Sequence, residues 1–420
     1  MPSVDRLSAL PDNIISHILS FLPIKISVST SILSRRWRFM WAHFPNLDFN
    51  NLSRDHETRF WNIIDRVMSN PRLESINTFR LKCNYSDLTE NKFDEWFAGR
   101  SINNLILCSR HDYLGNMYVL PRTILTCKTL VELKFTACPL PNFSGNDDMS
   151  FPRLKKIHLN DVHFVTDETL PKLLCHCPVL EDLSIVNCWV VNCYISSPTI
   201  ERLLVSIVFT ASGNRELRIN APALEYLQLF ICATSCVSAC ALPSLIEANI
   251  EFLDPFSYED ELFRLSVLGF VDRLCKVKRL KLSINVPLPY GIRSIPRFDN
   301  CTRLELDVNS HLFVKLLEAA NNLEVLVIFR DRLNSRIWEE PKQVPRCLLV
   351  RLAMVRVDEF ECREPEFSMA RYFLKNAKVL KRMEVHTSEG IDLDLTTKFN
   401  ALQKIALFTR GSNECELAFS

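Results

Sequence analysis

The main feature of this sequence is a short arrangement of hydrophobic positions that recurs along most of the chain. In each copy an apolar residue is followed three positions later by a second and two positions after that by a third, as in Leu130/Leu133/Phe135. The alternation at the end of the pattern predicts a short β-strand with one buried face. From Leu130 onward, successive copies start 24, 26, 20, 24 and 21 residues apart, so the pattern is a true internal repeat.

A repeat length in this range is typical of leucine-rich repeats, which stack through parallel strands into one cooperative body. The next clear copies are Leu154/Ile157/Leu159, Leu180/Leu183/Ile185, Ile200/Leu203/Val205, Leu224/Leu227/Leu229 and Leu245/Ala248/Ile250. Later copies are Val277/Leu280/Leu282, Cys301/Leu304/Leu306, Leu323/Leu326/Ile328, Leu349/Leu352/Met354, Leu380/Met383/Val385 and Leu402/Ile405/Leu407. Weaker early copies are Ile76/Phe79/Leu81 and Ile102/Leu105/Leu107. The pattern predicts an α/β solenoid with a parallel sheet on its concave face and helices and loops on its convex face.

The first fifty residues carry a different pattern, which predicts three short helices. Pro11 and Asp12 suit the first turn of a helix, where a missing N–H is tolerated and a carboxylate faces the positive end of the dipole. Pro23 ends this helix. A second run covers 24–32, and a third helix carries Leu33, Trp37 and Trp41. The apolar positions of the first helix share one side of a 3.6-residue period, and they are Ile14, Ile15, Ile18, Leu19 and Leu22.

This N-terminal segment also lacks charge over long stretches. Neither Asn13 to Ile24 nor Ile26 to Ser34 contains an Asp, Glu, Lys or Arg, although a surface helix normally has a charged outer face. A module of about forty residues also buries too little surface to be stable alone. We therefore expect one apolar face for the module's own core and another for a partner.

The order of residues in this module resembles the F-box of plant F-box proteins. The matching motifs are Leu10-Pro11-Asp12, Ile18-Leu19-Ser20-Phe21-Leu22-Pro23 and Ser31-Ile32-Leu33-Ser34-Arg35-Arg36-Trp37, with Trp41 four residues further on. The resemblance implies docking onto a Skp-type subunit and, through it, a cullin scaffold in an SCF ubiquitin ligase.

The C-terminal part resembles the FBD region, which follows F-box and leucine-rich repeats in many plant proteins. The resemblance lies in Trp338-Glu339-Glu340-Pro341, Val344-Pro345-Arg346-Cys347-Leu348, Glu364-Pro365-Glu366-Phe367 and Tyr372-Phe373-Leu374-Lys375-Asn376-Ala377. Glu364 and Glu366 suit the first turn of a helix whose buried stripe is Phe367, Ala370, Leu374 and Ala377. Strands are expected on either side, over Val350 to Val357 and Arg382 to His386.

Composition narrows the function classes. Of the 420 residues 47% are hydrophobic and 24% charged, as in a folded globular protein. Fifty Lys and Arg against 49 Asp and Glu give a net charge of +1, so no overall field attracts nucleic acid or an anionic membrane. Arg35, Arg36 and Arg38 are interpreted as a solvated basic face rather than a nucleic-acid site. Tyr226 to Ile246 lacks charge, but its polar residues favour a buried repeat over a membrane segment.

The cysteines raise the question of metal or thiol chemistry. Sixteen cysteines and no recognisable secretory signal suggest reduced thiols in the cytoplasm, the nucleus or both. Cys175-His176-Cys177 with Cys188 and Cys193 could suggest zinc, and Cys232, Cys236 and Cys240 recur every four residues. The spacing is that of no zinc finger, and the repeat explains both groups as packing. No nucleotide or metalloprotease motif occurs. We therefore expect no catalytic residue, no metal and no cofactor.

These observations predict four segments: an F-box over 1–50, a connector helix and irregular repeats over 51–125, leucine-rich repeats over 126–335, and the FBD region with the last repeats over 336–420. The favoured hypothesis is a non-catalytic substrate adaptor of an SCF ubiquitin ligase that binds an unknown target protein. A ligand-gated F-box receptor with a small molecule in the solenoid is the alternative, and an enzyme is a third. The predicted contacts with the Skp-type subunit are Leu10, Pro11, Ile14, Ile15, Ile18, Leu19, Leu22, Pro23, Leu33 and Trp37, some of which must instead form the module's own core.

Overall fold

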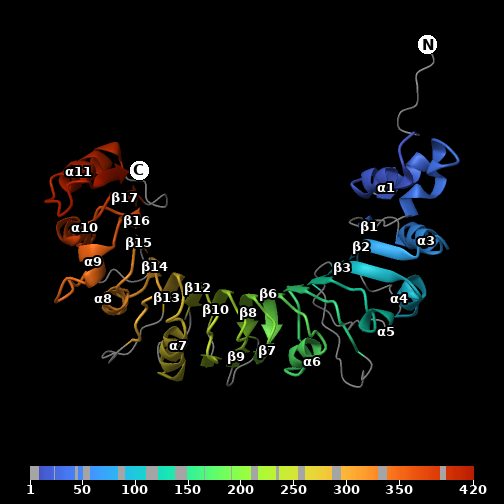
Figure 1. Cartoon of the computed structure of the whole chain (residues 1–420), viewed down its shortest axis with the longest axis horizontal. Helices are drawn as coiled ribbons and strands as arrows, with labels where there is room; N and C mark the ends of the chain where they lie inside the picture. Colours follow the sequence, from blue (N-terminus) through green and yellow to red (C-terminus); the bar gives the residue numbers. More distant parts are fainter. Residues whose placement is uncertain are drawn as a thin grey trace, which may run out of the picture. The chain divides into compact units, whose positions relative to one another are not determined.

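The structure of the chain is a computed structural model, which describes residues 9–22, 24–42, 46–50, 57–83, 90–109, 122–137, 149–164, 166–190, 192–209, 216–232, 236–253, 261–285, 295–329, 338–387 and 394–420. The chain forms two compact units, Met1–Ile200 and Glu201–Ser420, each of which is taken by itself below. In both units, parallel strands form a sheet; helices lie along one side of it, except that the N-terminal helical module lies at the β1 end (Figure 1).

The first unit opens with the helical module and continues as a parallel sheet in the order β1-β2-β3-β4-β5-β6. Its helices are α1 (Asp12–Ser20), α2 (Ile24–Ser29), the 3₁₀ helices η1 (Thr30–Ile32) and η2 (Trp37–Ala42), α3 (Glu57–Met68), α4 (Glu90–Phe97), α5 (Arg122–Leu125) and α6 (Thr169–Cys175). Its strands are β1 (Asn46–Asn50), β2 (Ser75–Cys83), β3 (Ser101–Ser109), β4 (Glu132–Thr136), β5 (Lys156–Asn160), β6 (Asp182–Val190) and β7 (Cys193–Ser196).

The second unit continues the same plan in the order β8-β10-β12-β13-β14-β15-β16-β17-β18, again all parallel. Its strands are β8 (Arg202–Phe209), β9 (Glu216–Asn220), β10 (Tyr226–Cys232), β11 (Cys236–Ala239), β12 (Glu247–Leu253), β13 (Arg279–Asn285), β14 (Arg303–Asp307), β15 (Val325–Ile328), β16 (Met354–Phe360), β17 (Arg382–Thr387) and β18 (Glu416–Phe419). Its helices are α7 (Glu261–Arg273), α8 (Ser310–Ala319), α9 (Arg346–Val350), α10 (Glu364–Asn376) and α11 (Leu395–Ala406).

The strand register explains why the hydrophobic pattern repeats. Equivalent apolar residues of neighbouring strands lie side by side in register. Each repeat therefore adds one residue to a continuous row of buried side chains, which we call the ladder. In the second unit this ladder is Leu227, Ala248, Leu280, Leu304, Leu326, Val355 and Met383. In the first unit it is Leu47, Phe79, Leu105, Leu133, Ile157 and Leu183. All of these side chains are buried, and the predicted α/β fold with a stacked parallel sheet is confirmed within each unit.

Two predicted repeat copies are wrong. Leu402/Ile405/Leu407 lies in and just after helix α11, and the last strand is β18. Leu349/Leu352/Met354 is shifted by three residues, because Leu349 belongs to α9 and the residues that pack inward are Leu352, Val355 and Val357. The expected strand from Val350 therefore begins only at Met354. Both errors arise because apolar residues three apart suit one side of a helix as well as this repeat.

Other elements also differ in part from the predictions. The helix expected over Phe60 to Met68 is α3, but Ile63 is half exposed and the face turned inward carries Trp61, Ile64 and Met68. In the second unit the side expected to carry helices also carries β9 and β11, which pair in parallel. The alternation of buried Leu217 and Ile219 with exposed Arg218 favours a strand there. The predicted FBD helix and the strand from Arg382 are confirmed as α10 and β17.

Candidate protein-binding site

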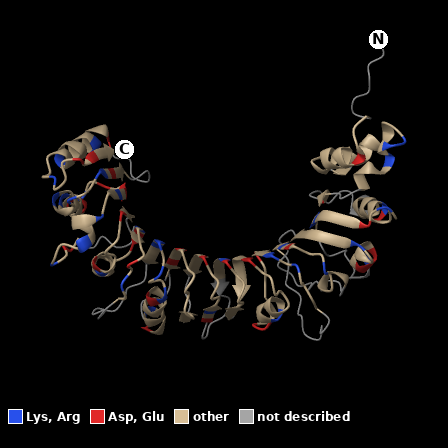
Figure 2. Cartoon of the chain, viewed as in Figure 1, with Lys and Arg blue, Asp and Glu red and all other residues tan. Residues whose placement is uncertain are grey.

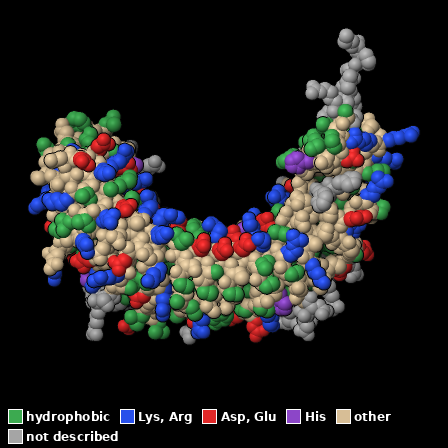
Figure 3. Space-filling view, viewed as in Figure 1, with side chains coloured by type: hydrophobic (Ala, Val, Ile, Leu, Met, Phe, Trp, Pro, Cys, Tyr) green, Lys and Arg blue, Asp and Glu red, His purple; other side chains and the backbone are tan. Residues whose placement is uncertain are grey.

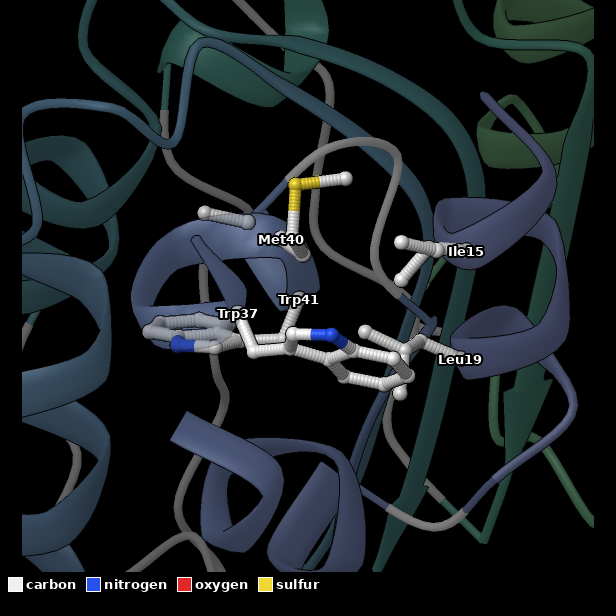
Figure 4. Packing of buried hydrophobic residues seen from close by; sticks show 6 residues of the cluster. Ile15, Leu19, Trp37, Met40 and Trp41 are labelled. Atoms are coloured by element: carbon white, nitrogen blue, oxygen red, sulfur yellow. The ribbon is translucent and has the colours of Figure 1, made fainter. Parts of the chain in front are cut away.

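The helical module at the start of the chain has a small core of its own. Ile15 and Leu19 of α1 pack against Trp37, Met40 and Trp41 of η2, as Figure 4 shows. Ala42 completes the buried cluster, and the partly buried side chains around it are Leu10, Leu22, Ile24, Val28 and, from α3, Val67. The two tryptophans are the largest side chains of this core, and large aromatic rings contribute the most buried area per residue.

The same helices carry a second group of apolar side chains that face outward. We call this group the exposed apolar set: Ile14, Ile18, Phe21, Ile26, Ile32 and Leu33, which are 39% to 88% exposed. Ile14 and Ile18 share the outer face of α1, and Phe21 follows at its C-terminal end. Hydrophobic side chains are visible on the surface of this module in Figure 3. Clustered exposed apolar residues in a folded protein mark interaction surfaces.

The structure divides the ten predicted contact residues into distinct groups. Ile15, Leu19 and Trp37 are buried in the module's own core, and Leu10 and Leu22 are partly buried against it. The exposed members are Pro11, Ile14, Ile18 and Leu33, while Pro23 lies outside the described residues. The predicted set did not include Phe21, Ile26 and Ile32. The lack of charge over Asn13 to Ile24 and Ile26 to Ser34 was the signal that could have found them.

A charged clamp joins the two ends of the module. The guanidinium group of Arg36 donates to the Asp12 carboxylate at 2.8 Å through Nε, and through Nη2 to both that carboxylate and the backbone carbonyl of Leu10. Both side chains are substantially exposed, so water screens the attraction between their charges. The contact fixes the start of α1 beside the segment that leads into η2.

Asparagine side chains attach the module to the first two strands. Asn46 of β1 donates from Nδ2 to the carbonyl of Ser20 at 2.7 Å, and Asn77 of β2 donates to Asn46 Oδ1 at 2.9 Å. Within the module, the buried hydroxyl of Ser27 donates to the carbonyl of Leu19 at 3.0 Å. The bond from Asn46 satisfies the Ser20 carbonyl at the end of α1, while the Leu19 carbonyl also accepts from the backbone N–H of Leu22 at 3.1 Å.

Of the cysteines considered as zinc ligands, Cys177, Cys188 and Cys193 pack as buried thiols, whereas Cys175 and Cys240 are exposed. Cys177 Sγ donates to the Leu173 carbonyl, and Cys188 Sγ to the carbonyls of Leu159 and Val186. Burial raises the pKa of the Cys177, Cys188 and Cys193 thiols to about 12, so they remain neutral at physiological pH. Over the described ranges, no three His, Cys, Asp or Glu side chains are grouped so that they could hold a metal ion.

The alternative hypothesis, a ligand-gated receptor, requires a site for a small molecule. A cleft of about 340 Å³ in the first unit is a candidate for such a site. It is lined by Phe97, Gly99, Arg100, Ser101, Ile102, Thr123, Thr126, Cys127, Lys128 and Thr129. The guanidinium group of Arg100 is already hydrogen-bonded to the carbonyls of Leu73, Trp96 and Met68 at 2.6 to 2.7 Å. Arg100 therefore connects α3 and α4 to the segment that precedes β2, and Lys128 is the other cation in the lining of the cleft.

The helical module followed by stacked parallel repeats defines an F-box protein with leucine-rich repeats. Comparison with protein families agrees with this class. The F-box domain matches residues 7–49, the FBD matches residues 339–385, and the family described as "FBD-associated F-box protein At5g56370, LRR repeats" matches residues 93–257.

Relatives from Arabidopsis thaliana match over almost the whole chain. The FBD-associated F-box protein At4g10400 is 31% identical over 99% of this chain and 100% of its own length. The F-box/FBD/LRR-repeat protein At3g52680 is 30% identical over 99% of this chain and 93% of its own length. The chain belongs to this family of F-box proteins with leucine-rich repeats and a C-terminal FBD. None of the helices in the described part of the chain is long and apolar enough to span a bilayer.

Proposed function

We propose that this protein is the substrate-recognition adaptor of an SCF ubiquitin ligase and is not itself catalytic. Its exposed apolar set docks on a Skp-type subunit, and its stacked repeats bind a target protein. The observation that supports this most is the pair of apolar faces on α1. Ile15 and Leu19 already fill the module's core, and Ile14 and Ile18 are left for a second protein.

The energetics of the exposed apolar set suit a stable complex. Burying a large aliphatic or aromatic side chain contributes about 1.5 to 3 kcal/mol, and a standard interface covers about 800 Å² on each partner. Phe21 stands out because aromatic side chains at the centre of an interface often dominate binding energy. We propose Phe21, Ile14 and Ile18 as the central contacts, with Pro11, Leu33 and the partly buried Leu10 and Leu22 around them.

The mechanism would be proximity. A target bound to the repeats is brought near a ubiquitin-charged enzyme elsewhere in the complex, which raises the effective concentration of its lysines. No bond is made or broken by this chain. The proposed sites of action are the cytoplasm, the nucleus or both.

A matched pair of double variants tests the docking surface. Ile18→Glu/Phe21→Glu places two charges in the exposed apolar set, and Leu262→Glu/Leu265→Glu does the same on α7, where these leucines are 72% and 52% exposed. Binding of each full-length protein to a purified Skp-type subunit would be measured by calorimetry. We expect the first variant to bind at least about 100-fold more weakly, since desolvating unpaired charges is unfavourable, and the second to bind like wild type. Equal affinities for the two variants would contradict the proposal.

The target can be sought with the same variant. A docking-deficient Ile18→Glu/Phe21→Glu protein should hold its target without delivering it for ubiquitination, so the target accumulates. Proximity labelling in cells that express this variant, compared with wild type, should enrich proteins whose abundance falls when wild-type protein is expressed.

A further inference from the structure

Two neighbouring turns in the FBD region lie side by side. One leads from α9 into β16 and the other from α10 into β17. The backbone N–H of Lys378 donates to the Leu348 carbonyl at 2.9 Å, and that of Lys381 donates to the Ala353 carbonyl at 2.8 Å. These two bonds bring together a set of side chains that we call the basic turn patch: Leu349, Val350, Arg351, Lys378, Val379 and Lys381.

The basic turn patch combines exposed aliphatic side chains with positive charge. Leu349, Val350 and Val379 are 38% to 51% exposed, and Arg351, Lys378 and Lys381 are exposed as well. The patch contains no acidic residue, and none of its three cations forms an ion pair with any other described residue. Its boundaries are marked by Glu324 and Glu416, whose backbones bond to Ala353 and Lys381 on the adjacent repeats.

Two earlier repeats carry short polar side chains at the same place in the turn. The two residues before the buried Cys301 are Asp299 and Asn300, and those before the buried Leu323 are Asn321 and Asn322. Asn322 Nδ2 donates to the Asp299 carbonyl at 2.8 Å, and Asn300 Nδ2 to the Lys276 carbonyl at 3.3 Å. Short polar side chains thus bridge one turn to the next.

In the two FBD turns these polar bridges are absent. The positions equivalent to the asparagine pairs hold Val350-Arg351 before the buried Leu352, and Lys378-Val379 before the buried Leu380. A valine side chain has no donor with which to bridge the turns. Of the cations, Lys378 reaches only the Lys375 carbonyl, at 3.4 Å. The cationic and aliphatic side chains at these positions therefore do not bridge the two turns as the asparagines do.

We propose that the basic turn patch binds an acidic peptide segment that also carries apolar side chains. Carboxylates of such a segment would pair with Arg351, Lys378 and Lys381, while its aliphatic groups cover the valines. Complementary charge sets the orientation and speeds the encounter. Single-stranded nucleic acid is disfavoured because the patch has no aromatic side chain on which bases could stack. The site does not depend on the proposed ligase role, since its test contains no Skp-type subunit.

Fluorescence anisotropy with the full-length protein tests this proposal. The probe is a fluorescein-labelled synthetic peptide of repeated Asp-Leu-Glu, titrated at about 50 mM and about 300 mM NaCl, concentrations at which charge screening differs strongly. The test variant is Arg351→Glu/Lys378→Glu/Lys381→Glu. The control, Lys128→Glu/Arg153→Glu/Lys276→Glu, makes the same change of charge at exposed cations elsewhere. A second variant, Val350→Ser/Val379→Ser, probes the aliphatic part without altering charge.

We expect the patch variant to bind the peptide at least about tenfold more weakly, the control to bind like wild type, and the serine variant to lose affinity a few-fold. Higher salt should weaken wild-type binding. Equal losses in the two triple variants would show that net charge alone matters and would overturn the proposal. No measurable binding by wild type, or tighter binding of a labelled single-stranded RNA than of the peptide, would also overturn it. Thermal unfolding of each variant verifies that it is folded.

Discussion

Arg36 and Asp12, 24 residues apart in sequence, meet through a 2.8 Å hydrogen bond from the guanidinium Nε to the carboxylate. Figure 2 marks the basic and acidic positions along the ribbon of the helical module in the first unit. The contact joins the Leu-Pro-Asp motif to the Ser-Arg-Arg-Trp motif. It gives a physical reason why these two motifs occur at this distance from each other in the sequence. Since Arg36 also bonds to the Leu10 carbonyl, it holds the start of α1 in place.

Replacing Arg36 by alanine should loosen this clamp with a modest effect on stability. Exposed ion pairs contribute about 0 to 1 kcal/mol, and we expect a loss at the upper end because the bond to Leu10 is lost too. Arg36→Lys should restore the charge but not both bonds, since an ammonium group lacks the planar fork of the guanidinium. Hydrogen exchange of the α1 amides provides the measurement, and unchanged exchange in Arg36→Ala would show that the clamp is not needed.

Adjacent isoleucines on α1 should respond differently to truncation. Ile15 is 0% exposed and Ile14 is 42% exposed. Ile15→Ala should destabilise the module by about 2 to 5 kcal/mol, because it leaves a cavity beside Trp37 and Trp41. Ile14→Ala should change its stability by less than about 0.5 kcal/mol. Native-state hydrogen exchange over residues 12–42 distinguishes the two, and similar losses would contradict the assignment of the core.

Replacing two glycines of the second unit by alanine should change stability in opposite directions. A Cβ on Gly411 would overlap the backbone carbonyl of Lys375, whereas a Cβ on Gly269, inside α7, would meet nothing within 4 Å. Gly411→Ala should lower the melting temperature, since backbone atoms must shift to make room. Gly269→Ala should raise stability by about 0.5 to 1 kcal/mol through helix propensity. Thermal unfolding monitored by circular dichroism checks both signs.

When the folded protein is alkylated, exposed cysteines should react much faster than buried ones. Cys175 and Cys240 are exposed, while Cys177 and Cys188 are buried with pKa values raised to about 12. Iodoacetamide at pH 8 should modify the first pair within minutes and the second only after unfolding, as read by peptide mass spectrometry. Rapid modification of Cys177 in the native protein would contradict its burial.

The same thiols should make stability depend on pH. In the unfolded chain they ionise near their ordinary pKa of 9.0, but in the folded protein burial keeps them neutral up to about pH 12. Their contribution is therefore complete below pH 9 and is lost as the pH rises from 9 toward 12. Denaturant titrations of wild type and Cys188→Ala across this range should show a shallower decline for the variant.

The repeats were predictable because burial on one side of a strand imposes an alternation that recurs once per repeat. Prediction failed where a helix could satisfy the same spacing. Leu402, Ile405 and Leu407 are three and two residues apart like a strand copy, yet α11 includes the first two. The pattern of hydrophobic positions contains no information that separates these cases, since both bury apolar residues three positions apart.

The exposed apolar set was predictable as a region but not residue by residue. Ile14 and Ile15 have the same side chain and adjacent positions, and a helix with apolar residues on two sides has no unique inward face. Packing with Trp37 and Trp41 decides that Ile15 points inward. The inward orientation of Ile15 therefore depends on η2, whose 3₁₀ geometry the sequence pattern did not reveal.

The hydrogen bonds from Asn77 to Asn46 and from Asn46 to Ser20 connect the end of α1 directly to the first two strands. A protein docked on α1 would therefore meet β1 and β2 at an angle determined when the chain folds. Under the proposed ligase role, a lysine of the target would be selected by its position in space rather than by the residues around it in its own sequence.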